Sequence, residues 1–320
     1  MFKNKKILVA GGTGLIGIPL VELLLEEGAD VTVVSLDDPS RAHPEAKFIR
    51  ADLRYFDKCL KVCTGMDYVF NLLCAKGSPA LTVKTPASLF VPNLMFSIAL
   101  AEAAREQGVS GYLFTSSVAV YPKAKVFKEG GVWKGWPSVN DRPAGWAKRM
   151  GELQIKFYRS EYGLKHFVTV RPPNVYGPYD NFQSQTAMVV PALIRDVLSG
   201  VNPLVISGNG SQKRDFIHAR DVAKGMIIVL KKDAKHPINL GSGKAVSIRE
   251  LIEIIVNNSK HKPEVVYDQS KPSGDDIRLM DISKARKIGF HPQISLEDGI
   301  QETMTWCKSN RDVKPVYSRT

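Results

Sequence analysis

The sequence predicts an α/β protein with a doubly wound parallel sheet, followed by a smaller mixed α/β domain. In the first half, short runs rich in β-branched residues alternate with longer amphipathic runs, which is typical of repeated βαβ units. A glycine-rich turn directly follows the first apolar run. After residue 172 the sequence changes to loops rich in proline and glycine, so a second domain is expected there.

The expected elements follow the hydrophobic periodicity. Gly28 and Gly108 stand where the C-caps of two helices would lie. Strands are expected at 7–10, 31–35, 47–50, 68–72, 111–116 and 166–171, and helices at 19–27, 93–107 and 191–199. The expected domains are 1–172 for dinucleotide binding, with 214–235 rejoining it, 173–310 for the substrate, and a tail at 311–320.

Composition narrows the class of protein. The chain has 320 residues, 44% of them hydrophobic and 24% charged, as in an ordinary globular enzyme, and no apolar run is long enough to predict a membrane span. The absence of an export signal and the presence of only four cysteines favour reduced thiols in the cytoplasm, and no metal site is expected. The net charge of +12 is scattered along the chain, which favours small anionic substrates over nucleic acid.

The turn ILVAGGTGLIG predicts a Rossmann-type dinucleotide site. Gly11 would permit the tight turn, Gly14 would let the backbone approach a pyrophosphate, and Gly17 would pack helix against strand. Two residues are candidates for binding the ribose of the cofactor. The usual acid position falls on Ser35, which with a nearby arginine would tolerate NADP(H), whereas Asp37 would favour NAD(H) by repelling a 2′-phosphate. NAD(H) is slightly favoured, with NADP(H) as the alternative.

Several ordered motifs follow the turn: GYLFTSSVAVYP, AGWAKRM, VRPPNVYGPYDNF, RDFIHARDVA and GDDIRLMDISKARKIGF. With the glycine turn, they resemble the extended short-chain dehydrogenase/reductase family that acts on nucleotide-activated sugars, above all its GDP-fucose synthase and UDP-galactose 4-epimerase branches. The resemblance covers nearly the whole chain. It implies a nucleotide-diphosphate sugar as substrate and a homodimer formed through the helices that contain Asn93 and 147–158. No nucleic-acid partner is expected, because the sequence has no basic stripe interleaved with aromatic residues, and no membrane partner is expected.

The resemblance also implies roles for individual residues. Lys148 would bind the nicotinamide ribose and lower the pKa of a catalytic tyrosine, and Ser117 would hydrogen-bond the reacting sugar oxygen. Taken singly, Lys148 could be a solvated helix lysine, and the serines could simply cap a strand. The other implied cofactor contacts are Thr13, Leu15, Ile16, Asp52, Leu53, Leu73, Cys74, Lys76, Asn93, Thr115 and Pro172, and the other implied substrate contacts are Ser116, Asn174, Arg214 and Arg278.

The chain departs from this family at the catalytic position. Ala144 stands where the family has its tyrosine, four residues before Lys148. Ala119 and Tyr179 replace the pair that epimerises C3 and C5 in GDP-fucose synthases, and Val118 and Ala119 replace the acid pair of the dehydratases. Redox chemistry at one carbon therefore remains, either 4-epimerisation or reduction of a 4-keto sugar.

Ala144 has three possible explanations. It could be an engineered substitution that traps substrate. The protein could use another hydroxyl, with Tyr179 as the first candidate and Tyr121 and Tyr176 behind it. Or the protein could bind cofactor and sugar without turning them over. The function favoured by the sequence is an NAD(P)-dependent 4-epimerase, with a GDP-4-keto-6-deoxy-sugar reductase and a non-catalytic binder as the alternatives.

Overall fold

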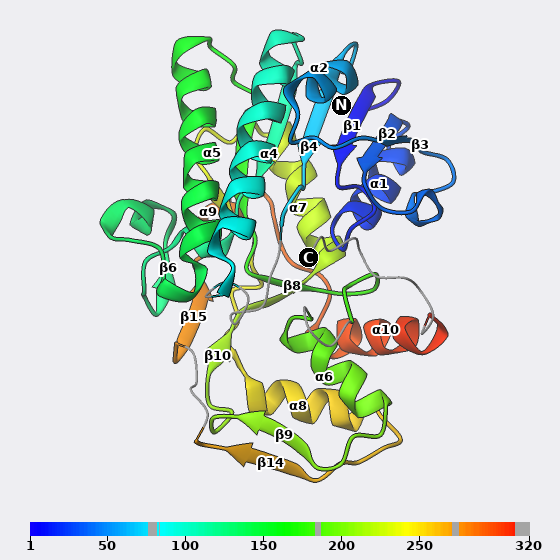
Figure 1. Ribbon diagram of the computed structural model, residues 1–320, viewed down its shortest axis with the longest axis vertical. Helices are drawn as coiled ribbons and strands as arrows, with labels where there is room; N and C mark the ends of the chain where they lie inside the picture. The colour runs from blue at the N-terminus through cyan, green and yellow to red at the C-terminus, as the bar shows by residue number, and fades with distance from the viewer. Residues whose placement is uncertain (76–81, 83, 183–186, 271–274, 311–320) are drawn as a thin grey trace.

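Seven parallel strands form one large sheet in the upper part of the molecule (Figure 1). The computed structural model describes residues 1–75, 82, 84–182, 187–270 and 275–310. The strand order is β12-β7-β5-β4-β1-β2-β3, so the chain winds outward from β1 in both directions, as the sequence predicts. The strands are Lys6–Ala10 (β1), Asp30–Ser35 (β2), Lys47–Arg50 (β3), Tyr68–Asn71 (β4), Gly111–Thr115 (β5), Phe167–Arg171 (β7) and Ile238–Asn239 (β12).

Both faces of this sheet are buried except at the edge strand β3, which explains why its central strands are continuous apolar runs. Successive side chains of β1 point to opposite faces, so Ile7 and Val9 enter one core while Leu8 and Ala10 enter the other. Helices α1 (Gly17–Glu26) and α7 (Ala219–Lys231) cover the first face. Helices α2 (Phe56–Cys63), α4 (Pro86–Glu106) and α5 (Arg142–Glu161) cover the second, with α4 and α5 side by side (Figure 1).

The expected strands of this sheet are confirmed, with ends that agree to within one residue. Gly28 and Gly108 have φ of +80° and +68°, so both adopt the left-handed conformation expected after a helix. The helix expected at 93–107 is longer than predicted, because α4 already begins at Pro86. Proline is common at the start of a helix because it lacks a backbone N–H, and the predicted helix begins just after Pro92. In the structure, Pro92 lies inside α4, in its second turn.

Helix α4 is long and apolar enough to cross a membrane by length and composition alone, with a mean hydropathy of 1.5 over its best window. In the structure it packs instead between α2 and α5. Its residues Leu100, Ala101 and Ala104 enter the second core of the sheet. The opposite side of α4 remains exposed and apolar, which is relevant to assembly below.

The lower part of the molecule has its own core, formed by α6 (Val189–Leu198), α8 (Ile248–Asn257) and α10 (Leu296–Ser309) (Figure 1). Three small sheets surround this core, with strand orders β13-β10-β15-β6, β11-β8 and β14-β9. The helix α9 (Ser283–Lys287) leads back toward the large sheet. The strands are Val126–Phe127 (β6), Asn174–Tyr176 (β8), Leu204–Ser207 (β9), Lys213–Arg214 (β10), Phe216–His218 (β11), Val246–Ser247 (β13), Val265–Asp268 (β14) and Ile277–Met280 (β15).

The chain crosses between these two parts more than once. Helix α7 follows the small strand β11 but packs against α1, β5 and β7, and β12 then extends the edge of the large sheet. In the other direction, β6 comes from the first half of the chain and pairs with β15. The domain limits of 172, 214–235 and 310 stay predictions.

Candidate functional site

The glycine turn lies between β1 and α1, and the local geometry explains why glycine occupies three of its positions. Gly11 has a φ of +83°, so it makes the tight turn that few other residues tolerate. A Cβ at Gly17 would lie 2.3 Å from the carbonyl oxygen of Gly11, so only glycine lets α1 pack this closely. A Cβ at Gly14 would meet only that same oxygen, at 3.4 Å, so its outer side is open to a ligand. Leu15 and Ile16 complete the turn at the N-terminus of α1, where anions bind favourably.

The end of β2 is joined to this turn by buried hydrogen bonds. The Thr13 hydroxyl lies 2.6 Å from Asp37 Oδ2 and 2.8 Å from Ser35 Oγ. Ser35 Oγ also accepts a hydrogen bond from the backbone N–H of Asp37. Both residues proposed for the ribose therefore lie beside the glycine turn, with the carboxylate of Asp37 held there by Thr13.

The segment after β3 carries the next expected cofactor contacts. The carboxylate of Asp52 accepts hydrogen bonds from Arg54, with 2.6 Å between Arg54 Nη2 and Asp52 Oδ2. Leu53 is buried, with 2% of its surface exposed. Their contacts with a cofactor stay predictions.

Lys148 connects the ends of two neighbouring strands. Its Nζ donates hydrogen bonds to the carbonyl oxygens of Thr115 at 2.8 Å and Leu73 at 3.0 Å, and only 3% of the residue is exposed. Lys148 is therefore a buried cation at the carboxyl edge of the sheet, and the solvated-lysine interpretation is wrong. Cys74 follows Leu73 and is exposed, and Lys76 lies outside the described residues.

Asn93 makes its side-chain hydrogen bonds to the backbone of the protein. Its side chain is fully buried and donates to the carbonyl oxygens of Ala75 at 2.9 Å and Leu89 at 2.7 Å, while its oxygen accepts from the Ala75 N–H. Its contact with a cofactor stays a prediction. Asn93 holds the segment that follows β4 against α4.

Thr115 provides a test of whether the site fits a polar cofactor. Its Oγ1 is buried and has no hydrogen-bond partner among the described residues, although its carbonyl oxygen binds Lys148. An unpartnered buried hydroxyl is costly unless a ligand or water satisfies it. Together with the open side of Gly14, this hydroxyl fits a dinucleotide lying across the carboxyl ends of the strands.

The two serines after β5 have different partners. Ser117 caps the short 3-10 turn Val118–Val120, because its Oγ accepts from the Ala119 N–H at 3.2 Å. Its hydroxyl can still donate to a substrate oxygen. Ser116 is 3% exposed and donates to Glu152 Oε1 at 2.5 Å, and its contact with a substrate stays a prediction. The carbonyl of Pro172 accepts from the Val118 N–H and fixes this turn.

Ala144 lies in the first turn of α5, one helical turn before Lys148 and on the same face. The next residue explains how closely α5 approaches the serine segment. A Cβ on Gly145 would lie 2.3 Å from the carbonyl oxygen of Ala119. A side chain at position 144 therefore projects beside Lys148 at the end of the 117–120 segment.

Two arginines lie next to each other in the small part of the molecule. Arg214 and Arg278 are register partners on the parallel strands β10 and β15. Arg278 pairs with Asp141 just before α5, and burial together with the positive charge of Arg278 lowers the pKa of Arg214. The guanidinium of Arg214 donates hydrogen bonds to the carbonyl oxygens of Lys213 and Asp275.

Asn174 joins the arginine region to the strand β11. Its Nδ2 donates to the carbonyl oxygen of Asp215 at 3.0 Å, and the residue is half-buried. The carboxylate of Asp215 is itself buried and accepts from Ser242, Gly243 and Met280. The structure therefore places Asn174 in a fixed frame, and its contact with a diphosphate stays a prediction.

The three candidate tyrosines lie in different surroundings. Tyr121 is 1% exposed, donates to Asn239 Oδ1 at 2.6 Å and accepts from Arg171, so it is a structural residue. Tyr176 is also buried, which raises its pKa. The ring of Tyr179, with φ of +69°, lies against Trp306 of α10 at 5.1 Å. A proton-transfer role for Tyr179 stays a prediction.

The sequence analysis did not predict a buried ion pair between Arg171 and Glu152, which also binds the Ser116 hydroxyl. Arg171 donates to both carboxylate oxygens of Glu152, at 2.6 and 2.8 Å, and each side chain is less than 5% exposed. Burial works against the charge of Arg171, but Glu152 more than offsets it and the pKa of Arg171 is raised. An arginine that ends an otherwise apolar strand is the signal that could have indicated this pair.

A glycine turn on a doubly wound sheet, a buried lysine one helical turn after Ala144 and two adjacent arginines are the features expected of a nicotinamide-dependent enzyme that acts on nucleotide sugars. The profile of the NAD dependent epimerase/dehydratase family matches residues 7–241, and the chain belongs to this family.

Relatives of both expected kinds are found. GDP-L-fucose synthase 1 of Arabidopsis thaliana is 31% identical, over 96% of this chain and 94% of that protein. The structure of a UDP-N-acetylglucosamine 4-epimerase from Methanobrevibacter ruminantium is 31% identical, with a TM-score of 0.84, over 96% of this chain and 99% of that one. A GDP-6-OMe-4-keto-L-xylo-heptose reductase from C. jejuni is 25% identical, with a TM-score of 0.86, over 97% and 99% of the two chains.

Proposed function

We propose that the chain binds a nicotinamide dinucleotide and a nucleotide-diphosphate sugar and acts as a 4-epimerase. The observation that supports this most directly is the position of Lys148, buried at the carboxyl ends of β4 and β5 with the unpartnered Thr115 hydroxyl beside it. When bound there, the nicotinamide ring supplies a hydride acceptor and donor. Lys148 would hold the adjoining ribose, and Ser117 would donate a hydrogen bond to the oxygen on C4 of the sugar.

The paired arginines support a phosphorylated substrate. Arg214 and Arg278 place two guanidinium groups on neighbouring strands although like charges repel, and a diphosphate would offset that repulsion. Asn174 would add an amide from β8. For the cofactor, NAD(H) is proposed first because Asp37 places a carboxylate beside the turn, where it would repel a 2′-phosphate; NADP(H) is the alternative.

The reductase is the second candidate, and it is supported by the similarity to a GDP-L-fucose synthase and to a GDP-heptose reductase. The two functions differ in how they use the cofactor. An epimerase returns the hydride to the same substrate and can retain its cofactor, whereas a reductase consumes NADPH from solution. A mass spectrum of the molecules that co-purify with the protein would separate them, because retained cofactor favours the epimerase.

Arg278 provides a direct test of substrate binding. We expect Arg278→Leu to weaken the binding of UDP or GDP by roughly tenfold to a hundredfold, since it removes a charged hydrogen-bond donor to phosphate. Isothermal titration calorimetry with each nucleotide would measure the change. Arg249→Leu is the matched control, because Arg249 lies on α8 over the ring of Tyr267. Equal affinities for Arg278→Leu and wild type would show that the nucleotide binds elsewhere.

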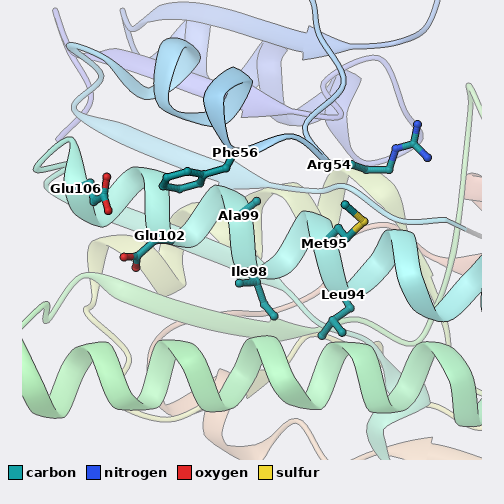
Figure 2. Close-up of a pocket in the computed structure, with 8 residues that line it drawn as sticks. All are labelled: Arg54, Phe56, Leu94, Met95, Ile98, Ala99, Glu102 and Glu106. Atoms are coloured by element: carbon teal, nitrogen blue, oxygen red, sulfur yellow. The ribbon is translucent and has the colours of Figure 1, made fainter.

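We also propose a homodimer formed through α4 and α5. Val91, Met95 and Ile98 on α4 and Phe157 on α5 are 37–54% exposed, and together they form an apolar face. Figure 2 shows that Phe56 of α2 lies along the same side, where it borders a shallow apolar cavity of about 520 Å³ with Met95 and Ile98.

The dimer can be tested by charging this face. Ile98→Glu is expected to convert a dimer to monomers in analytical ultracentrifugation at micromolar concentration, because a carboxylate cannot be buried unpaired between helices. Val266→Glu is the matched control, since Val266 is a similarly exposed apolar residue on β14. A monomeric wild-type protein, or an equal effect of both substitutions, would contradict the proposed interface.

A further inference from the structure

A second cavity, of about 610 Å³, lies where α10 meets the N-terminal ends of α1 and α7. We call it the α10 pocket, and the residues that matter in it are Glu22, Tyr179, His218, Glu302 and Trp306. Its volume is typical of a small-molecule site. Of all the cofactor and substrate residues considered above, only Tyr179 lines it.

His218 places an unsatisfied donor in the α10 pocket. Only 3% of the residue is exposed, and its Nδ1 accepts from the backbone N–H of Arg220 at 3.3 Å, where it caps α7. Nδ1 is therefore unprotonated and Nε2 carries the hydrogen. Nε2 has no hydrogen-bond partner among the described residues, so it needs an acceptor from outside.

The carboxylate of Glu302 lies close to His218, but it does not satisfy the Nε2–H group. Its Oε2 lies 3.5 Å from His218 Nε2, and no hydrogen bond joins them. Burial and the charge of Arg220 lower the pKa of His218 to about 4, so the imidazole is neutral at physiological pH and forms no ion pair. An atom that both accepts from Nε2–H and donates to the carboxylate would satisfy the two groups together. A hydroxyl group has this pair of properties.

The charges of the α10 pocket select against anions. It contains the carboxylates of Glu22, Asp298 and Glu302 but only the one guanidinium of Arg220, which pairs with Glu22 at 2.8 Å. This acidic excess is unusual in a chain of net charge +12, and it separates the pocket from any phosphate site. A metal ion does not fit either, because the described residues contain no group of three ligands of the required kind.

Aromatic rings form one side of the α10 pocket. The rings of Tyr179 and Trp306 have centroids 5.1 Å apart and are inclined at 59°, and Phe182 stacks on Trp306 at 6.0 Å. Aromatic rings beside a carboxylate attract organic cations, because a cation is favoured both by the ring face and by the acid. They also pack against the apolar face of a sugar ring.

From these features we propose that the α10 pocket binds a small protonated amine that also carries hydroxyl groups, such as an amino sugar. The ammonium group would bind Glu302 beside Trp306. A hydroxyl oxygen would accept from His218 Nε2–H. None of the residues proposed to bind the cofactor or the diphosphate of the nucleotide sugar lines this pocket, so the proposal does not depend on the proposed function.

The test uses three sugars that differ in charge: glucosamine, glucose and glucuronate. We expect glucosamine to bind the full chain, measured by saturation-transfer NMR and titration, with glucose at least about tenfold weaker and no binding of glucuronate. Binding should persist in the presence of saturating NAD with UDP or GDP. Equal binding of glucose, displacement of glucosamine by these nucleotides, or no binding of any of the three sugars would overturn the proposal.

Variants locate the binding. Glu302→Gln keeps the shape of a half-exposed side chain and removes its charge, so it should weaken glucosamine at least about tenfold. Glu297→Gln, on the same helix but outside the pocket, should have no effect. His218→Asn should also weaken binding while keeping the helix cap, because asparagine is a good N-cap residue. Unchanged glucosamine binding in Glu302→Gln would rule out this pocket.

Discussion

Ala144→Tyr is expected to raise the turnover of a nucleotide-sugar substrate by about 10²–10⁴-fold, the range that a positioned acid-base group contributes. Position 144 lies one helical turn before Lys148 on the same face of α5, so a tyrosine there would place its hydroxyl near the buried ammonium group. The positive charge of Lys148 would lower the pKa of that tyrosine and make it a better proton acceptor. Turnover would be measured with the nucleotide sugar that binds in calorimetry.

Ala144→Phe is the matched control, because it supplies the same ring without the hydroxyl. We expect no gain in turnover from Phe, although it fills the same space. If Ala144→Tyr changes nothing and Tyr179→Phe abolishes turnover, the proton moves through Tyr179 and the tyrosine mechanism does not apply to this chain. Activity in neither the wild type nor Ala144→Tyr would favour the non-catalytic binder.

Local signals were sufficient to predict six of the seven strands of the large sheet, and the two-residue strand β12 was not predicted. Most strands of this sheet are runs of apolar residues that are buried on both faces, which makes them easy to recognise, whereas the edge strand β3 (KFIR) is largely exposed. Gly11 and Gly17 were predictable for the same reason, since their roles follow from backbone geometry. Short strands such as β6 and β10 have only two residues each, and their pairing depends on distant segments.

The side chains of the candidate site were harder to predict, because their direction depends on partners far along the chain. Ser116 and Ser117 are neighbours with the same hydroxyl, yet Ser116 turns toward Glu152 and Ser117 caps the next turn. Nothing local distinguishes them. Asn93 has a polar amide that suggests a ligand contact, but its hydrogen bonds go to the backbone at Ala75 and Leu89.

The buried pair of Glu152 and Arg171 should have the largest effect on stability. Glu152→Gln is expected to lower the free energy of unfolding by about 3–5 kcal/mol, because it leaves the guanidinium of Arg171 buried without its counter-charge. Such a loss is a large fraction of the roughly 5–15 kcal/mol that stabilises a typical domain. Urea unfolding followed by circular dichroism would measure it. Asp30→Asn, which breaks the exposed pair with Lys47, should cost less than about 1 kcal/mol.

A double substitution separates the charge from the shape of this pair. Glu152→Met combined with Arg171→Met removes both charges and keeps much of the volume, so it should recover a substantial part of the stability lost in Glu152→Gln. The double variant also removes the acceptor of the Ser116 hydroxyl and the donor to Tyr121. Recovery of stability without recovery of nucleotide-sugar binding would show that the pair positions the serine segment. A double variant less stable than Glu152→Gln would instead show that these hydrogen bonds, rather than the unpaired charge, dominate the stability of the site.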